Sequence, residues 1–123
     1  MRCLIVDDSA TFRDAASTML ERAGISVVGT ACNRAEALDR NRELHPDVIL
    51  VDIDLGAESG FDVVEALHLA GSPAPSVILI STHSEHDFAD LITASPAVGF
   101  LPKFALSSDS IRELVGLSGP RDT

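Results

Sequence analysis

The sequence predicts a doubly wound α/β domain, in which helices cover both faces of a five-stranded parallel sheet. Apolar runs of strand length alternate with segments of helical periodicity along the 123 residues, and the connections between them are short. The run at 48–51 is wholly aliphatic, as expected of a strand that is covered on both faces. For such a sheet we expect the strand order 2-1-3-4-5.

Three strands and two helices are predicted in the first half of the chain. In order, they are a strand at 3–6, a helix at 12–23, a strand at 25–31, a helix at 34–44 and a strand at 48–51. The strands are aliphatic and β-branched runs, whereas the apolar residues of the first helix recur on one helical face. Gly24 ends the first helix. Asn33 is a suitable N-cap for the second helix, which Pro46 prevents from continuing.

The second half of the chain continues the alternation. We expect a helix after Ser59-Gly60, a strand at 77–80, a helix at about 84–93, a strand at 98–101 and a helix from about 108. The apolar positions assigned to the first of these helices are Phe61, Val64, Leu67 and Leu69. The segment 71–75, Gly-Ser-Pro-Ala-Pro, is the clearest loop in the chain.

Length and composition predict a single domain at 2–117, followed at 118–123 by a flexible tail or the start of a linker. No apolar run approaches the roughly 18 residues of a membrane span, and the N-terminus lacks a signal-peptide layout, so we expect a cytoplasmic protein. The formal net charge of −10 argues against direct contact with nucleic acid or an anionic membrane. Cys3 and Cys32 are interpreted as small buried hydrophobic residues.

Chemically active residues follow the ends of four predicted strands. Asp7-Asp8 follow the first strand, Asp52 the third, Ser81 the fourth, and Lys103, the only lysine in the chain, follows the fifth. Because the carboxyl ends of parallel strands share one edge of the sheet, we expect these side chains to converge there.

Clustered carboxylates either raise their pKa values or recruit a cation, and Mg²⁺ prefers such oxygen ligands. The Lys103 ammonium is suited to bind a phosphoryl oxygen, and the Ser81 hydroxyl could donate a hydrogen bond to another. Asp52 ends the central strand and is therefore the natural nucleophile toward phosphorus. The sequence thus predicts a site for Mg²⁺ and phosphate.

In order and spacing, these residues resemble the response-regulator receiver domains of two-component signalling. The resemblance covers residues 2–117 and implies the flavodoxin-like (βα)5 fold of chemotaxis regulators. Its motif is an acidic pair, a phospho-accepting Asp, a Ser or Thr, an aromatic residue and a Lys, and the matching residues are Asp7-Asp8, Asp52, Ser81, Phe100 and Lys103.

The resemblance implies a signalling domain that is not an enzyme in its own right, beyond assisting its own phosphorylation and dephosphorylation. A histidine kinase or phosphotransfer protein would donate a phosphoryl group to Asp52. Mg²⁺ would bind Asp8 and Asp52 directly, Asp7 through water, and the backbone carbonyl of Asp54. Ser81 and Lys103 would hold the phosphoryl oxygens.

Output, in this family, depends on a switch. Ser81 would move toward the phosphate and Phe100 would rotate inward, which would change the face formed by the fourth helix, fifth strand and fifth helix. That face would regulate an attached or separate output, such as transcription, and could form a homodimer. Gly56, where many receivers carry Pro, departs from the family pattern and predicts a looser loop after Asp52. Phe104 follows Lys103, so the frequent cis Lys-Pro bond is absent.

Three other functions would fit parts of this pattern. Asp52-Ile53-Asp54 resembles the motif of haloacid-dehalogenase phosphatases, but those enzymes place the nucleophile on the first strand and the acidic pair after the lysine. An FMN-binding protein of the same sheet class would need aromatic residues, and the chain has no Trp or Tyr. A pure interaction module would not need the complete acid, hydroxyl and lysine set. His83 and His86 lack the third nitrogen or sulfur ligand that a zinc site would require.

Overall fold

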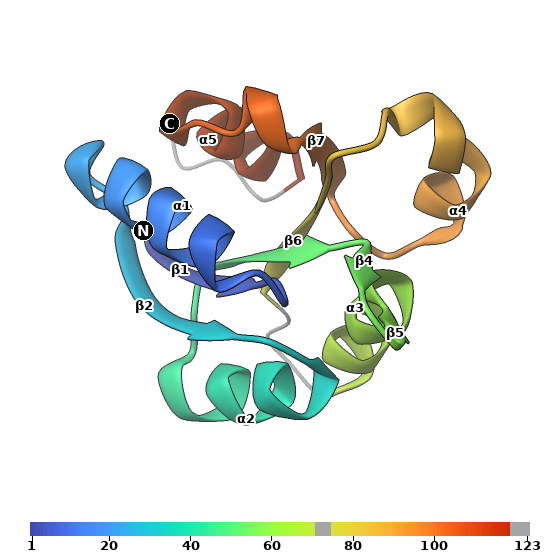
Figure 1. Cartoon of the computed structure of the whole chain (residues 1–123), viewed down its shortest axis with the longest axis horizontal. Coiled ribbons are helices and arrows are strands. Elements are labelled where there is room, and N and C mark those ends of the chain that lie inside the picture. Colours follow the sequence, from blue (N-terminus) through green and yellow to red (C-terminus); the bar gives the residue numbers. More distant parts are fainter. Residues whose placement is uncertain (71–74, 119–123) are drawn as a thin grey trace.

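The computed structural model describes residues 1–70 and 75–118 (Figure 1). Its main sheet is parallel, with the order β2-β1-β3-β6-β7. The strands are Arg2–Val6 (β1), Ser26–Ala31 (β2), Val48–Asp52 (β3), Ser76–Ser81 (β6) and Gly99–Pro102 (β7). The predicted fold class is confirmed, and so is the order, because β6 and β7 are the fourth and fifth strands of this sheet.

In the described residues, five α-helices connect or follow these strands. They are Ala10–Arg22 (α1), Arg34–Leu44 (α2), Gly60–Leu69 (α3), Ala89–Ala94 (α4) and Ser108–Ser118 (α5). Asn33 caps α2 as predicted, since its side chain accepts a hydrogen bond from the Glu36 N–H. Gly24, with φ of 93°, follows the end of α1 in the left-handed region that glycine adopts without strain.

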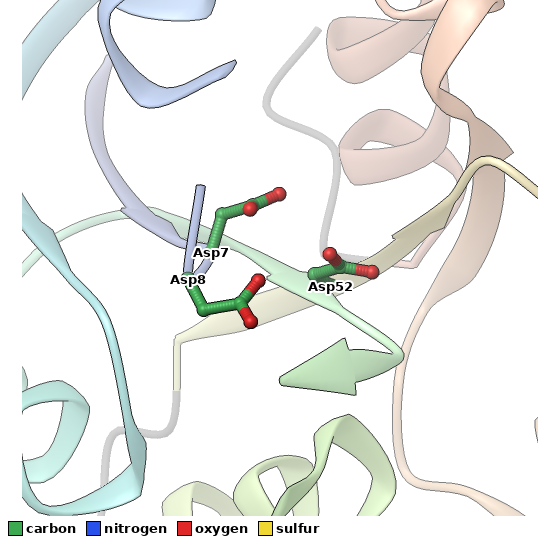
Figure 2. A group of neighbouring side chains, drawn as sticks. All are labelled: Asp7, Asp8 and Asp52. Atoms are coloured by element: carbon green, nitrogen blue, oxygen red, sulfur yellow. The ribbon is translucent and has the colours of Figure 1, made fainter. Parts of the chain in front are cut away.

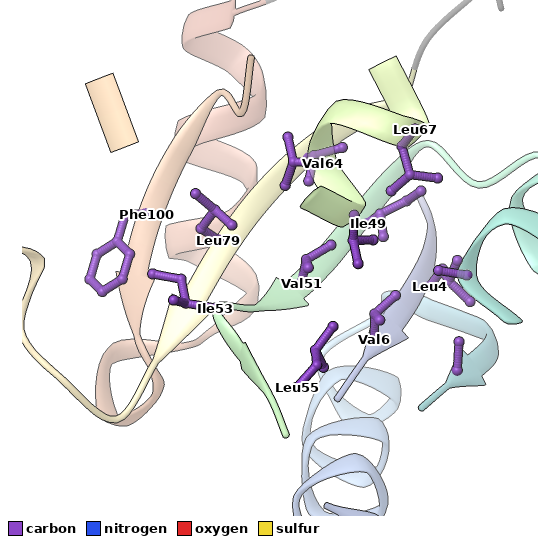
Figure 3. Close-up of a cluster of buried hydrophobic side chains, with 14 residues drawn as sticks. Leu4, Val6, Ile49, Val51, Ile53, Leu55, Val64, Leu67, Leu79 and Phe100 are labelled. Carbon is purple, nitrogen blue, oxygen red and sulfur yellow. The ribbon is translucent and has the colours of Figure 1, made fainter. Parts of the chain in front are cut away.

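Two apolar cores lie on opposite faces of the sheet, because side chains alternate along each strand. In β3, Ile49 and Val51 face the core beneath α2, α3 and α4. Figure 3 shows these two side chains beside Val64 and Leu67 of α3. Val48 and Leu50 face the other core, beneath α1 and α5. Every residue of β3 is buried, which explains why its sequence is a continuous apolar run.

The structure differs from the sequence prediction in several local elements. The predicted helix at 84–93 is divided into a 3₁₀ turn, Glu85–Phe88 (η1), and the short α4, and neither contains a buried residue. Asp54–Leu55 (β4) and Glu58–Ser59 (β5) form an antiparallel hairpin, and Lys103–Ala105 (η2) form another 3₁₀ turn. None of these three elements was predicted.

Some predictions about single residues were also wrong or lie outside the described part of the chain. Leu69, assigned to the apolar face of α3, is 78% exposed at the end of that helix. Cys3 is fully buried, whereas Cys32 is only partly buried. Residues 71–74 of the predicted loop and 119–123 of the predicted tail are outside the described residues. No described helix has both the length and the hydrophobicity needed to cross a membrane.

Candidate functional site

Three carboxylates converge at the carboxyl edge of the sheet. Asp7 and Asp8 follow β1, and Asp52 ends the neighbouring β3 (Figure 2). Each offers one oxygen, and these oxygens all lie within 4.8 Å of one another. Asp7 is fully buried and Asp52 is 6% exposed, whereas Asp8 is exposed. The predicted acidic cluster is therefore present, with its outer member open to solvent.

Lys103 supplies a positive charge inside this cluster. Its Nζ lies 2.7 Å from Asp7 Oδ2 and donates a hydrogen bond to Asp52 Oδ2 at 3.1 Å. The same Nζ lies 4.2 Å from the centroid of the Phe12 ring, which begins the inner face of α1. Because only 15% of the lysine side chain is exposed, these contacts replace most of its hydration.

Burial and charge shift the pKa values of this pair. Burial raises the pKa of Asp52 to about 6, and the charge of Asp7 acts in the same direction. Hydrogen bonds from the Asp54 N–H and from Lys103 oppose that rise. Burial lowers the pKa of Lys103, but the Asp7 and Asp52 carboxylates outweigh it and raise that pKa above its ordinary value. The lysine is therefore held in its charged form.

The acidic cluster fits a hard divalent cation. Asp7 Oδ1 accepts a hydrogen bond from the Ser9 N–H at 2.8 Å. The buried Asp7 Oδ2 accepts none from the described residues and lies 2.7 Å from Lys103 Nζ. Oxygen ligands with two buried negative charges and one exposed charge suit Mg²⁺ or Ca²⁺ rather than a softer metal. His83 and His86 belong to no group of three potential ligands in the described residues, which leaves the zinc alternative without support.

Ser81 and Phe100 lie on the strands next to Asp52. In the register of β3 and β6, Asp52 is opposite Ile80, so Ser81 lies one residue further toward the carboxyl edge. The buried Ser81 Oγ accepts a hydrogen bond from the His83 N–H at 2.9 Å. Phe100 is 7% exposed and packs in the core that contains Leu79 (Figure 3). Phe100 therefore already points inward in this structure, as was predicted for it only after phosphorylation.

Gly60 fixes the backbone around Asp52, a role that the sequence analysis missed. Its N–H donates a hydrogen bond to the Ile53 carbonyl at 2.7 Å, and a Cβ at this position would lie 2.1 Å from the Asp52 carbonyl oxygen. Only glycine allows α3 to begin so close to the end of β3. The Ser-Gly pair before the apolar helix was visible in the sequence, but this close approach was not.

A parallel sheet of this order, with acids, a hydroxyl and a lysine at its carboxyl edge, is the arrangement that the resemblance to receiver domains implies. A family profile for the response regulator receiver domain matches residues 3–115. The chain belongs to the response regulator receiver domain family, which places it in two-component signalling.

Relatives and solved structures agree with this assignment. The chain is 36% identical over 106 residues to protein-glutamate methylesterase/protein-glutamine glutaminase 1 of Methanosarcina mazei, which covers 84% of this chain. The match spans only 29% of that relative's length. The response regulator domain of Thermotoga maritima CheB superimposes with a TM-score of 0.81 at 25% identity, covering 97% of this chain and 98% of that one.

A response regulator protein from Burkholderia pseudomallei, solved with a phosphorylated aspartic acid, a calcium ion and citrate, has a TM-score of 0.79 at 26% identity. It covers 92% of this chain and 65% of that one.

Removing the lysine charge should destabilise the domain in a pH-dependent way. The pKa of Asp52 is raised from its ordinary 3.8 to about 6, so this group's contribution to the free energy of unfolding falls as pH rises through that window. Lys103→Met removes an interaction that opposes the rise, so the pKa of Asp52 should increase further. We expect a loss of roughly 3 kcal/mol at about pH 8 and a smaller loss at about pH 5, measured by urea denaturation in EDTA. When Asp52 is also replaced, as Asp52→Asn, the loss of stability caused by Lys103→Met should differ less between pH 8 and pH 5. An equal loss at both pH values would contradict the electrostatic role.

Proposed function

We propose that Asp52 accepts a phosphoryl group from a phosphohistidine of a histidine kinase or phosphotransfer protein. An Asp52 carboxylate oxygen forms a new bond to phosphorus, while the donor's nitrogen–phosphorus bond breaks and leaves its electron pair on the imidazole nitrogen. The observation that carries this proposal is the position of Asp52. Its nearly buried carboxylate ends the central strand between a cluster of acids and the ammonium of Lys103.

Mg²⁺ is the proposed cofactor at this edge. Asp8 and Asp52 would bind it directly, Asp7 through water, and the backbone carbonyl of Asp54 would be a further ligand. The bound cation would neutralise charge on the transferred phosphoryl group. Lys103 would then exchange part of its contact with Asp7 and Asp52 for a phosphoryl oxygen, and the Ser81 hydroxyl would donate to another.

For the output, we propose that phosphorylation changes the face formed by α4, β7 and α5, and that this face controls an effector. The methylesterase relatives extend well beyond the matched segment, which supports an attached effector domain. A separate target protein, or a homodimer formed through the same face, would be controlled by the same phosphorylation. The domain would act in the cytoplasm, with no catalytic activity beyond its own phosphorylation and dephosphorylation. A net charge of −10 disfavours direct contact of this domain with nucleic acid.

Phosphorylation can be tested with a small donor. Incubation with acetyl phosphate and Mg²⁺ should add one phosphoryl group that is labile to hydroxylamine, as an acyl phosphate is. Intact-mass spectrometry of Asp52→Asn should show no adduct, whereas Asp54→Asn should retain it, because Asp54 would contribute only its backbone carbonyl. An acid-stable adduct on serine would disprove the proposed acceptor.

Cation binding should stabilise the folded protein, because a ligand that binds only the folded state raises the free energy of unfolding. We expect millimolar Mg²⁺ to raise the melting temperature, and Asp8→Asn or Asp52→Asn to remove most of that rise. Asp62→Asn, which removes a carboxylate from the exposed face of α3, is the matched control. If both site variants keep the full rise, the cation binds elsewhere.

The switch should be visible by amide exchange with beryllofluoride, a phosphate mimic. Because η1 and α4 contain no buried residue, the conformational change should concentrate there and in β7, within residues 82–106. Ser81→Ala should bind the mimic yet lose most of that exchange change. The largest changes falling in α1 or α2 would mean that the output face has been misassigned.

A further inference from the structure

The β4–β5 hairpin, which follows Asp52, is attached to α2 by a hydrogen bond. Glu58 lies on β5, and its Oε1 accepts a hydrogen bond at 2.8 Å from the backbone N–H of Arg34, the first residue of α2. We propose that Glu58 is a positioning residue for the cation site. Its bond to Arg34 holds the hairpin in place. The hairpin in turn orders the Asp8 and Asp52 carboxylates.

The hairpin contacts two of the three carboxylates. On β4, the Asp54 N–H donates a hydrogen bond to Asp52 Oδ1 at 3.1 Å. At the turn, Gly56 passes so close to Asp8 that a Cβ would lie 3.3 Å from its Oδ2. The position of the hairpin therefore sets the orientation of Asp52 and the space available to Asp8.

The hairpin needs an external attachment because its turn is permissive. Gly56 adopts φ of 73°, and each strand has only two residues. The two strands pair Leu55, which is buried, with Glu58, which is exposed. One side of the pair is thus held by apolar packing, and the bond from Glu58 to α2 holds the other.

The amino terminus of α2 provides a matching donor. Two of its neighbouring N–H groups have local partners, since Asn33 accepts from Glu36 and Glu36 accepts from Cys32. The Arg34 N–H belongs to the first turn, where no intrahelical acceptor exists, and the helix dipole favours a carboxylate there. Glu58 satisfies this donor from a segment 24 residues away in sequence.

This inference rests on the cation site proposed above, and Mg²⁺ titration by calorimetry tests it. Glu58→Ala should weaken Mg²⁺ binding by about threefold to tenfold. Mutating a residue that orients a metal ligand typically weakens metal binding by about tenfold or more, and the effect should be smaller here because Glu58 is exposed. Glu58→Gln keeps an acceptor oxygen and should bind Mg²⁺ nearly as the wild type does. Glu65→Ala removes the same charge from the exposed surface of α3 and should leave binding unchanged.

A second variant removes the donor instead of the acceptor. Arg34 occupies the first position of α2, where proline is accepted, and Asn33 before it is extended with φ of −154° and ψ of 178°. Arg34→Pro should therefore keep the helix, lose the N–H and weaken Mg²⁺ binding as Glu58→Ala does, while Arg34→Ala should not. The double variant Glu58→Ala/Arg34→Pro should be no weaker than either single variant. Amide exchange at 54–59 should accelerate in both single variants without Mg²⁺.

The outcomes separate the two proposals. If the wild type and Glu65→Ala bind no Mg²⁺, the cation site fails and the role of Glu58 fails with it. If the wild type binds Mg²⁺ and Glu58→Ala binds it equally well, only the role of Glu58 is overturned. Equal weakening in Glu58→Gln and Glu58→Ala would mean that the negative charge acts directly, which would also overturn the positioning role.

Discussion

The buried contact between Lys103 and the acids Asp7 and Asp52 is the interaction on which the site depends. Two carboxylates at the end of adjacent strands, one fully buried and one nearly so, repel strongly at this separation unless a cation lies between them. Lys103, the first residue after the fifth strand, supplies that cation, 3.1 Å from Asp52 and 2.7 Å from Asp7. Lys103 thereby offsets part of the repulsion between these acids in the absence of a metal, and the remaining negative charge is what the proposed metal would neutralise.

The backbone around Asp52 is constrained as closely as its side chain. Gly60 lets α3 begin against the Asp52 carbonyl, and the β4–β5 hairpin leaves from the same point with the Asp54 N–H bonded to Asp52 Oδ1. The Asp52 carboxylate is thus held by the strand, the hairpin and the lysine. Each carboxylate oxygen already accepts one hydrogen bond, Oδ1 from the Asp54 N–H and Oδ2 from Lys103, so the orientation of the group is fixed before any ligand binds.

Much of this arrangement could be predicted from the sequence, and the reason for each success or failure is physical. Aliphatic runs that end in Asp52 or Ser81 predict parallel strands, because only strands buried on both faces are apolar throughout. Parallel strands place their carboxyl ends at one edge of the sheet, so the shared site could be predicted too. Asn33 could be recognised because capping is local. The hairpin at 54–59 and the exposure of Leu69 could not be predicted, since two-residue strands have no periodicity and the end of an amphipathic helix can project beyond the sheet. Lys103 was placed correctly, but its contact with the Phe12 ring depends on the packing of α1, which no local pattern shows.

The distribution of buried apolar residues indicates how a signal at Asp52 would travel. Phe100 already packs in the core, so little free energy remains to be gained by turning it inward. The Ser81 hydroxyl, by contrast, accepts a hydrogen bond from the His83 N–H, and the His83 ring packs edge-on against Phe88 of η1 with 5.9 Å between centroids. Phe88 in turn contacts Phe61 of α3. A phosphoryl group that drew Ser81 toward Asp52 would therefore act first on η1 and α4, which bury no residue and resist displacement least. Coupling of about 1 to 3 kcal/mol would be enough to shift such a segment, so the weak anchoring of α4 would suit the proposed output face formed by α4, β7 and α5 to transmit the signal.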